Sequence, residues 1–224
     1  MFWGLLLGSA VAADQGVKPN GTVELDGKAT PVHWDDGDTF TIVGAGKSAR
    51  LAGYNTLESY GPVHRFGPGA TRLVTNADNA TEVAKSSKWK CTTLSGSGGY
   101  GRIQVDCPGL RDSLLSAGLA HLFSVDKEAR TASVQAQAEA IEHRRGMWSE
   151  GAPEFVITSV HSLDEKPGAK ETYNRVVSTV TGQSEKRMHS NVYKTCTWVC
   201  DGGSCLLYVP YRNRYGEEKA ECLN

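Results

Sequence analysis

The sequence lacks an excess of charge of either sign. Its 224 residues include 24 Lys or Arg and 25 Asp or Glu, which gives a formal net charge of −1. The balance also holds in parts, since residues 15–150 carry fifteen basic and fifteen acidic side chains and residues 151–224 carry nine of each. This excludes a chain-wide basic surface for long-range capture of polyanions, so any polyanion site has to be local or assisted by a metal ion.

A long hydrophobic run is also missing. The first thirteen residues contain no charged side chain and end in small residues, but a helix that crosses a bilayer needs about 20 apolar residues. The pattern is typical of a secretory signal peptide cleaved after Ala12 or Ala13, with a buried N-terminal strand or helix as the alternative. No cysteine precedes Cys91, so an acylated cysteine cannot anchor the mature chain. We expect a secreted protein, periplasmic or extracellular, that is monomeric and has no stable membrane association.

The sequence contains six cysteines, and an even number in an exported chain indicates disulfide bonds. Cys91 and Cys107 flank a Gly-rich turn and can face each other across a hairpin. Three pairings are open for the four cysteines near the C-terminus, Cys196, Cys200, Cys205 and Cys222. Their spacing matches no standard zinc module, so we expect disulfides there and not a metal site.

The distribution of β-forming residues and turns predicts a small barrel in the first part of the chain. Residues 30–43 are rich in β-formers around a turn at 35–38, and a further strand is expected at 49–54. Strands are also expected at 87–94 and 102–107, on either side of the Gly-rich turn. Apolar residues at helical spacing predict three helices. The first helix is expected to begin at Pro68 and the second after Pro108. The third is expected from about residue 129 to residue 145.

This order of elements predicts an α+β fold, mainly β, with a five-stranded OB-fold barrel capped by three helices at residues 29–150. The signal peptide occupies residues 1–13 and an N-terminal segment occupies 14–28. Residues 151–224 are expected to form a small disulfide-rich extension with strands at 155–160, 191–199 and 206–211 and a hairpin turn at 202–203. The third helix is expected to bury Val134, Ala138 and Ile141.

The turn at 35–38 carries two acidic side chains. Gly37 lets the backbone turn, so the carboxylates of Asp36 and Asp38 can approach a common point. Paired carboxylates on a tight turn suit a hard cation such as Ca²⁺, which takes several oxygen ligands. The same motif occurs in many plain turns, so it is weak evidence by itself.

Two arginines and a glutamate complete a set suited to phosphodiester chemistry. Arg50 starts an expected strand, Glu58 follows its end, and Arg102 precedes a later strand. A guanidinium binds phosphate through two parallel hydrogen bonds and stays protonated, and a carboxylate can orient or deprotonate an attacking water. Each residue alone is better explained as a solvated side chain on an exposed strand, so their combination carries the hypothesis.

The region from about residue 29 to 150 resembles the staphylococcal-nuclease (thermonuclease) family in the order and spacing of five motifs. The matching pieces are DGDT at 36–39, RLAGYNTLE at 50–58, YGR at 100–102, SLLSAGLA at 113–120 and GMW at 146–148. The joint pattern is specific and covers more than half of the chain. The resemblance implies a calcium-dependent nuclease that cleaves DNA and RNA at the 5′ P–O bond, leaves 3′-phosphate ends, and favours single strands and AT-rich duplex.

The resemblance also implies roles for individual residues. Asp38 corresponds to the main calcium carboxylate, and Asp36 is its acidic neighbour. Thr56 would offer its backbone carbonyl to the calcium ion. Glu58 stands at the place of the general base that positions the attacking water. Arg50 and Arg102 match the two arginines that hold the phosphate, and the second is a candidate proton donor to the leaving oxygen.

Two residues depart from the family pattern. Asn55 stands where the family has a second calcium-binding carboxylate, so its amide oxygen can coordinate but one negative charge is missing. Such a charge near a surface contributes roughly 1–4 kcal/mol at about 4 Å, so we expect calcium binding weakened about ten- to a thousandfold, with activity retained. Leu57 replaces a proline, which removes a rigid turn before Glu58.

Other residues and functions stay open. Tyr100 is a candidate for stacking on a base or for packing, and His64 for contact with substrate or metal or for a local loop role. One alternative function is a nucleic-acid-binding OB-fold module whose catalysis has decayed through Asn55. Another is a surface interaction module that uses residues 154–224. The presence of Arg50, Glu58 and Arg102 together favours the enzyme.

Overall fold

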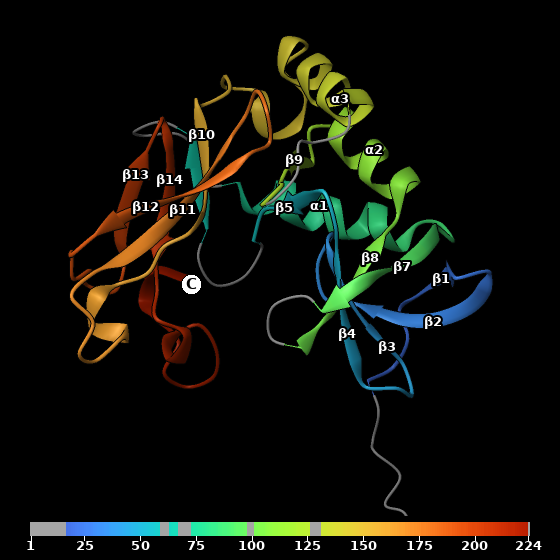
Figure 1. Ribbon diagram of the computed structural model, residues 1–224, viewed down its shortest axis with the longest axis horizontal. Helices are drawn as coiled ribbons and strands as arrows, with labels where there is room; N and C mark the ends of the chain where they lie inside the picture. The colour runs from blue at the N-terminus through green and yellow to red at the C-terminus, as the bar shows by residue number, and fades with distance from the viewer. Residues whose placement is uncertain (1–16, 59–62, 67–72, 98–100, 126–130, 224) are drawn as a thin grey trace, which may run out of the picture.

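The computed structural model describes residues 17–58, 63–66, 73–97, 101–125 and 131–223. The expected signal peptide and Tyr100 lie outside these residues. The fold is α+β and mainly β, with a closed barrel and three helices in the first part of the chain and further sheets in the last part. Figure 1 shows the two parts beside each other, with β5, β9 and α1 drawn between them.

The barrel has six strands, where the sequence predicted five. Their order is β1 (Gly21–Leu25), β2 (Lys28–Trp34), β3 (Thr39–Ile42), β4 (Lys47–Leu51), β8 (Ile103–Asp106) and β7 (Lys90–Ser97). Strand β7 pairs with β1 in parallel, which closes the barrel. Inward-facing side chains such as Val23, Phe40 and Val105 are fully buried, as expected for a small barrel filled by its own residues.

The additional strand, β1, comes from the segment predicted to precede the barrel. Asp26 and Gly27 join it to β2 with φ angles of 50° and 78°. An Asp-Gly pair with both φ angles positive is typical of a two-residue hairpin. The Asp26 carboxylate also accepts hydrogen bonds from the N–H and the hydroxyl of Thr93 on β7. The barrel therefore begins near residue 21 and not at residue 29.

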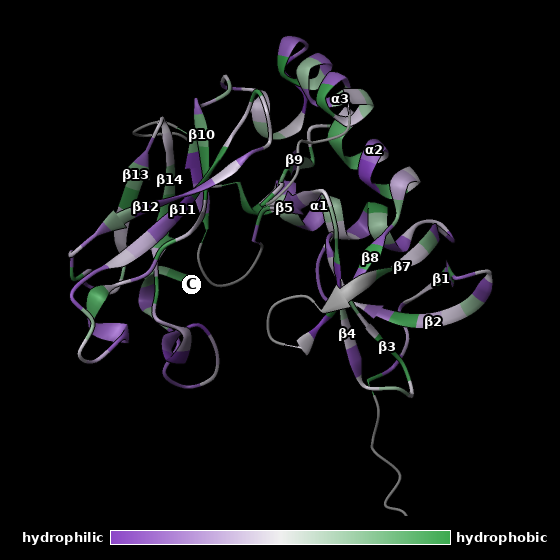
Figure 2. Cartoon of the chain, in the orientation of Figure 1, coloured by the Kyte–Doolittle hydropathy of each residue, from purple (hydrophilic) through white to green (hydrophobic). Residues whose placement is uncertain are grey.

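The described residues contain three α-helices, as predicted. They are α1 (Val74–Lys85), α2 (Pro108–Ser116) and α3 (Thr131–Glu142). Of the apolar face predicted for α3, Val134 and Ile141 are half-buried and pack against the core. The prediction is wrong for Ala138, which is exposed, and the fully buried side chains include the polar Ser133 and Gln137. Gln137 accepts a hydrogen bond from the N–H of Leu122 and donates one to the carbonyl of Thr179. Figure 2 accordingly shows hydrophilic and hydrophobic turns alternating along α3.

The C-terminal extension contains more β-structure than predicted. One sheet has the order β10 (Phe155–Ser159), β11 (Thr172–Ser178), β12 (Ser184–His189), and the other β13 (Thr197–Asp201), β14 (Ser204–Tyr208), β6 (His64–Phe66). The predicted strands at 155–160 and 206–211 correspond to β10 and β14, and residues 202–203 make the predicted hairpin turn. The strand predicted at 191–199 is wrong over most of its length, and the β11–β12 hairpin was not predicted.

The extension and the first part of the chain are joined by strand pairing and by a common apolar cluster. Strand β6 lies early in the chain, yet it pairs with β14 at the edge of a C-terminal sheet. Strands β5 (Tyr54–Thr56) and β9 (Ala120–Leu122) form a separate two-stranded sheet. One apolar cluster contains both Leu57 and Phe66 from the first part and Val156 from the extension. The two parts therefore depend on each other for burial.

All six cysteines form disulfide bonds. Cys91–Cys107 joins β7 to the start of α2, as predicted. Of the three pairings left open near the C-terminus, the structure has Cys196–Cys222 together with Cys200–Cys205. In the part of the chain that is described, no helix is both long and apolar enough to cross a bilayer.

Candidate functional site

The acidic turn joins β2 to β3 at the rim of the barrel. The N–H of Asp38 donates to Oδ1 of Asp36 at 2.9 Å, which fixes the turn. Gly37 lies in the bend without a positive φ angle. A side chain at this position has no space, because a Cβ there would lie 2.6 Å from Cγ2 of Thr56 and 2.9 Å from Cβ of Ala80. The turn is thus packed directly against β5 and α1.

Asp38 is a buried carboxylate, 1% exposed, with a hydrogen bond at each oxygen. Its Oδ1 accepts from the guanidinium of Arg50 and, at 3.0 Å, from the hydroxyl of Thr39. Its Oδ2 accepts from the backbone N–H of Thr56 at 2.7 Å. The β3–β4 register places Thr39 opposite Arg50, so regular strand pairing brings these groups together.

Arg50 connects the residues that the sequence assigned to metal and phosphate. While Nη1 donates to Asp38, Nη2 donates to Oδ1 of Asn55 at 2.6 Å. The guanidinium therefore lies between the oxygens of Asp38 and Asn55. The structure brings together the side chains of Asp36, Asp38, Arg50 and Asn55 and the backbone of Thr56.

The two carboxylates of the turn influence each other. Burial, and then the neighbouring charge of Asp38, raise the pKa of Asp36 to about 9, although Arg50 opposes the shift. Burial is the larger of the two causes, and the charge of Arg50 offsets them only in part.

These oxygens suit a calcium ion in chemical type. Among the described residues, no group of three or more His, Cys, Asp or Glu side chains is arranged as a metal site. Calcium would therefore depend on the carboxylates of Asp36 and Asp38 and on uncharged oxygens from Asn55 or the backbone. The residues offer oxygens of the type that calcium takes, but the Arg50 guanidinium is bound to Oδ1 of Asp38 and Oδ1 of Asn55 in this structure. A calcium ion at these two oxygens would have to displace the guanidinium.

Glu58 lies two residues after β5, at the wall of a pocket that continues into the extension. Its side chain reaches solvent, but surrounding protein desolvates the carboxylate and raises the pKa of Glu58 to about 7. The Asp38 charge adds to this rise, and Arg50 and Arg214 oppose it. Leu57, the residue in place of the family proline, is 2% exposed and packs in the shared apolar cluster. Burial of Leu57 anchors the chain before Glu58 without a proline.

Arg102 lies next to the same strands. Parallel pairing of β4 with β8 sets Ala49 opposite Ile103 and Arg50 opposite Gln104. Arg102 immediately precedes β8 and is half-buried. The pairing of β4 with β8 therefore brings the backbone at Arg102 close to the strand that carries Arg50.

His64 is placed in the junction with the extension. It is 4% exposed in β6, and its Nε2 lies 2.8 Å from the carbonyl oxygen of Ile157 on β10. Burial lowers the pKa of His64 to about 4, so the ring is neutral at neutral pH and Nε2–H donates to that carbonyl. This contact supports a structural role for His64 and separates it from the acidic turn. The prediction for Tyr100 falls outside the described residues.

Sequence reasoning missed the residues that the extension contributes. Arg214 and His161 line the pocket beside Glu58. Arg214 follows a short helical turn, Tyr211–Asn213, among several charged residues, and no local pattern marks it. The pairing of β6 with β14 brings this segment to the site.

The site therefore combines a buried acidic turn, an arginine that bridges two of its oxygens, and a glutamate at a pocket. Neither a comparison with protein-family models nor one with curated proteins finds a match for this chain.

Proposed function

We propose that the chain is a secreted, calcium-dependent phosphodiesterase that cleaves DNA and RNA and leaves 3′-phosphate ends. The observation that carries the proposal is the junction of Asp38, just before β3, with Arg50 on β4 and Asn55 on β5, while Glu58 follows two residues after β5. These are the residues that the motifs resembling the staphylococcal-nuclease family assign to the reaction. The three disulfide bonds agree with an exported protein.

The proposed reaction is attack of water on a phosphorus atom of the nucleic-acid backbone. Glu58 accepts a proton from the water, whose oxygen forms the new P–O bond while the bond to the 5′ oxygen breaks. A base whose pKa lies near the working pH suits this transfer, and the pKa of Glu58 is about 7. The departing 5′ oxygen takes up a proton, for which Arg102 is the candidate donor.

Arg50 holds the phosphate and stabilises its additional negative charge in the transition state. Its Nη groups now donate to Asp38 and Asn55, so calcium at these two oxygens would release the Nη groups for the phosphate. Asp36, Asp38 and Asn55 would hold the calcium ion, which supplies Lewis-acid charge at the phosphate. Positive charge beside the reacting phosphate is the main requirement for catalysis, because the phosphate carries more negative charge in the transition state than in the substrate.

The direct test is digestion of single-stranded DNA by the mature protein. About 10 mM CaCl₂ is used, roughly tenfold above the Kd of weak extracellular calcium sites. We expect cleavage that stops on adding a chelator and that is lost in Glu58→Gln. Glu139→Gln, which removes an exposed charge from α3, is the matched control and should cleave like wild type. Binding of DNA without cleavage at any calcium concentration would instead support the decayed binding module.

A further inference from the structure

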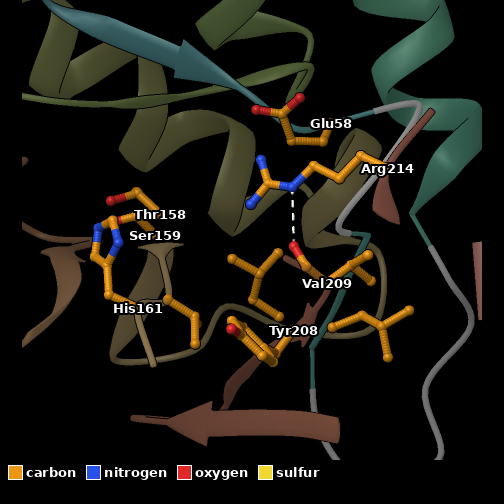
Figure 3. A pocket seen from close by; sticks show the side chains of 10 residues that line it. Glu58, Thr158, Ser159, His161, Tyr208, Val209 and Arg214 are labelled. Carbon is orange, nitrogen blue, oxygen red and sulfur yellow. Dashed lines mark hydrogen bonds between the residues drawn. The ribbon is translucent and has the colours of Figure 1, made fainter. Parts of the chain in front are cut away.

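The pocket beside Glu58 is built mainly by the C-terminal extension. Its lining includes Thr158 and Ser159 from β10, Tyr208 from β14, and Arg214 from the segment after β14. Figure 3 shows the Glu58 carboxylate next to the guanidinium of Arg214, with the ring of His161 across the pocket. The proposed site on the barrel therefore opens into a pocket whose other wall is formed by the extension.

Arg214 is held in place by the backbone of the extension. Its Nε–H donates to the carbonyl of Val209 at 2.9 Å, the bond drawn in Figure 3. The guanidinium carbon also lies 5.9 Å from the ring centroid of Tyr211. Because Nε is engaged, the terminal Nη groups are the part of the guanidinium available to a ligand. The Cys196–Cys222 disulfide closes the segment that carries Arg214.

Other polar groups of the pocket are already engaged or neutral. The hydroxyl of Tyr208 donates to Glu165 at 2.9 Å, and Nδ1 of His161 lies 3.7 Å from the same carboxylate. Burial lowers the pKa of His161. Of the described residues that line the pocket, Arg214 is the one with a permanent positive charge. Arg214 and Glu58 both lie in the described part of the chain, and they form no ion pair with each other.

A polyanionic chain that approaches Glu58 meets negative charge from Glu58 and Asp38. A cation on the far side of Glu58 offsets that repulsion, and a planar guanidinium binds a phosphate with two parallel hydrogen bonds. Thr158 and Ser159 line the same space, and the hydroxyl of Thr158 donates to the carbonyl of Arg175. The pocket volume is about 140 Å³, well below the roughly 300–1,000 Å³ of pockets for drug-sized ligands. It suits one backbone unit of a longer chain.

We propose that Arg214 binds a backbone phosphate next to the cleaved one, so that the extension selects polynucleotide chains over small phosphodiesters. The inference rests on the proposed function for the identity of the ligand, and it adds a substrate-binding residue that lies outside the barrel. A second phosphate contact lengthens the recognised substrate and does not touch the reacting atoms. Its effect belongs to binding and not to the chemical step.

Steady-state kinetics on two substrates test this division of roles. The assays are run well above the pKa of about 7 of Glu58, so that loss of the Arg214 charge, which raises this pKa, does not change the ionisation of Glu58. For a single-stranded oligonucleotide, we then expect Arg214→Ala to raise KM about tenfold with kcat little changed, since a charged hydrogen bond is lost. For bis(p-nitrophenyl) phosphate, which has one phosphate, both constants should stay near wild type under the same conditions. Arg214→Lys keeps the charge and should recover part of the oligonucleotide KM. Arg212→Ala, which removes an exposed arginine two residues away, is the matched control and should leave both substrates unaffected.

Binding provides a readout that does not need catalysis. In the Glu58→Gln protein, the affinity for a fluorescent single-stranded oligonucleotide is measured at several salt concentrations. Loss of one phosphate contact should reduce the slope of log K against log salt by about 0.7. We expect this reduction with Arg214→Ala and not with Arg212→Ala.

The outcomes separate the two proposals. Cleavage by wild type with unchanged oligonucleotide KM and salt slope in Arg214→Ala would overturn the role of Arg214 and leave the nuclease standing. Binding that depends on Arg214 without any cleavage would keep Arg214 and overturn the enzyme. An equal loss on both substrates would show that Arg214 supports Glu58 and not a neighbouring phosphate. Absence of both binding and cleavage would overturn both proposals.

Discussion

The backbone N–H of Thr56 donates to Oδ2 of Asp38 at 2.7 Å, so the carboxylate after β2 ties β5 to the barrel rim. The other oxygen of the same carboxylate is bound to Arg50. Asp38 is therefore a structural link between three strands as well as a candidate metal ligand.

Replacing Asp38 should destabilise the fold. Asp38→Ala leaves Arg50 without its buried partner, and breaking a buried pair in this way costs about 3–5 kcal/mol. Unfolding in urea, followed by circular dichroism, measures the free energy of unfolding. Asp78→Ala, at an exposed position of α1, should change it by less than about 0.5 kcal/mol. Equal effects of the two variants would mean that Asp38 contributes no link between the strands.

A carboxylate at position 55 should strengthen the proposed calcium binding. In Asn55→Asp a second negative charge lies beside Asp38, and a charge at about 4 Å adds roughly 1–4 kcal/mol. We expect the calcium concentration for half-maximal DNA cleavage to fall tenfold or more. Isothermal titration of calcium gives the same comparison without catalysis. Asn79→Asp adds the same charge at an exposed position of α1 and should have no effect. An unchanged calcium requirement in Asn55→Asp would remove residue 55 from the metal site.

Buried His64 should make the protein less stable in acid. Its pKa is about 4 in the folded chain and about 6.5 in the unfolded chain. Between these values the unfolded chain binds the extra proton, so the free energy of unfolding falls as pH drops from about 6.5 to 4. The difference amounts to about 3 kcal/mol for this residue.

Urea unfolding at several pH values checks this dependence. His64→Gln keeps a donor for the Ile157 carbonyl but does not titrate, so its free energy of unfolding should depend less on pH than that of wild type. His143→Gln, at an exposed site after α3, should follow the wild-type curve. The same pH dependence in wild type and His64→Gln would show that His64 is not buried as a neutral ring.

Removal of the extension should destabilise the barrel. A chain that ends at Glu150 loses β14, the partner of β6, and uncovers Leu57 and Phe66, which share a cluster with Val156. We expect a clear fall in the melting temperature or aggregation. A chain that ends at Pro210 and carries Cys196→Ser keeps β14 and should stay folded. If the chain ending at Glu150 melts like the full chain, the barrel is an independent unit.

Local sequence determined most of the regular elements. Residues 108–116 and 131–142 are helical because apolar and helix-forming residues recur at helical spacing there. Cys91–Cys107 was predictable because a short hairpin brings its two cysteines face to face. The same holds for Asp38 and Arg50, which lie at the ends of strands close in sequence and therefore meet across regular pairings.

The tertiary structure alone decided which distant segments meet. Strand β6 has three residues, and a short β-forming stretch does not specify its partner, because strand pairing depends on packing and burial. Pairing of β6 with β14 buried His64 and placed Arg214 beside Glu58. The polar inner face of α3 also followed from its partners, since Gln137 is buried where the N–H of Leu122 and the carbonyl of Thr179 satisfy it. Local propensity determined the elements, and long-range burial and hydrogen bonding decided how they form one site.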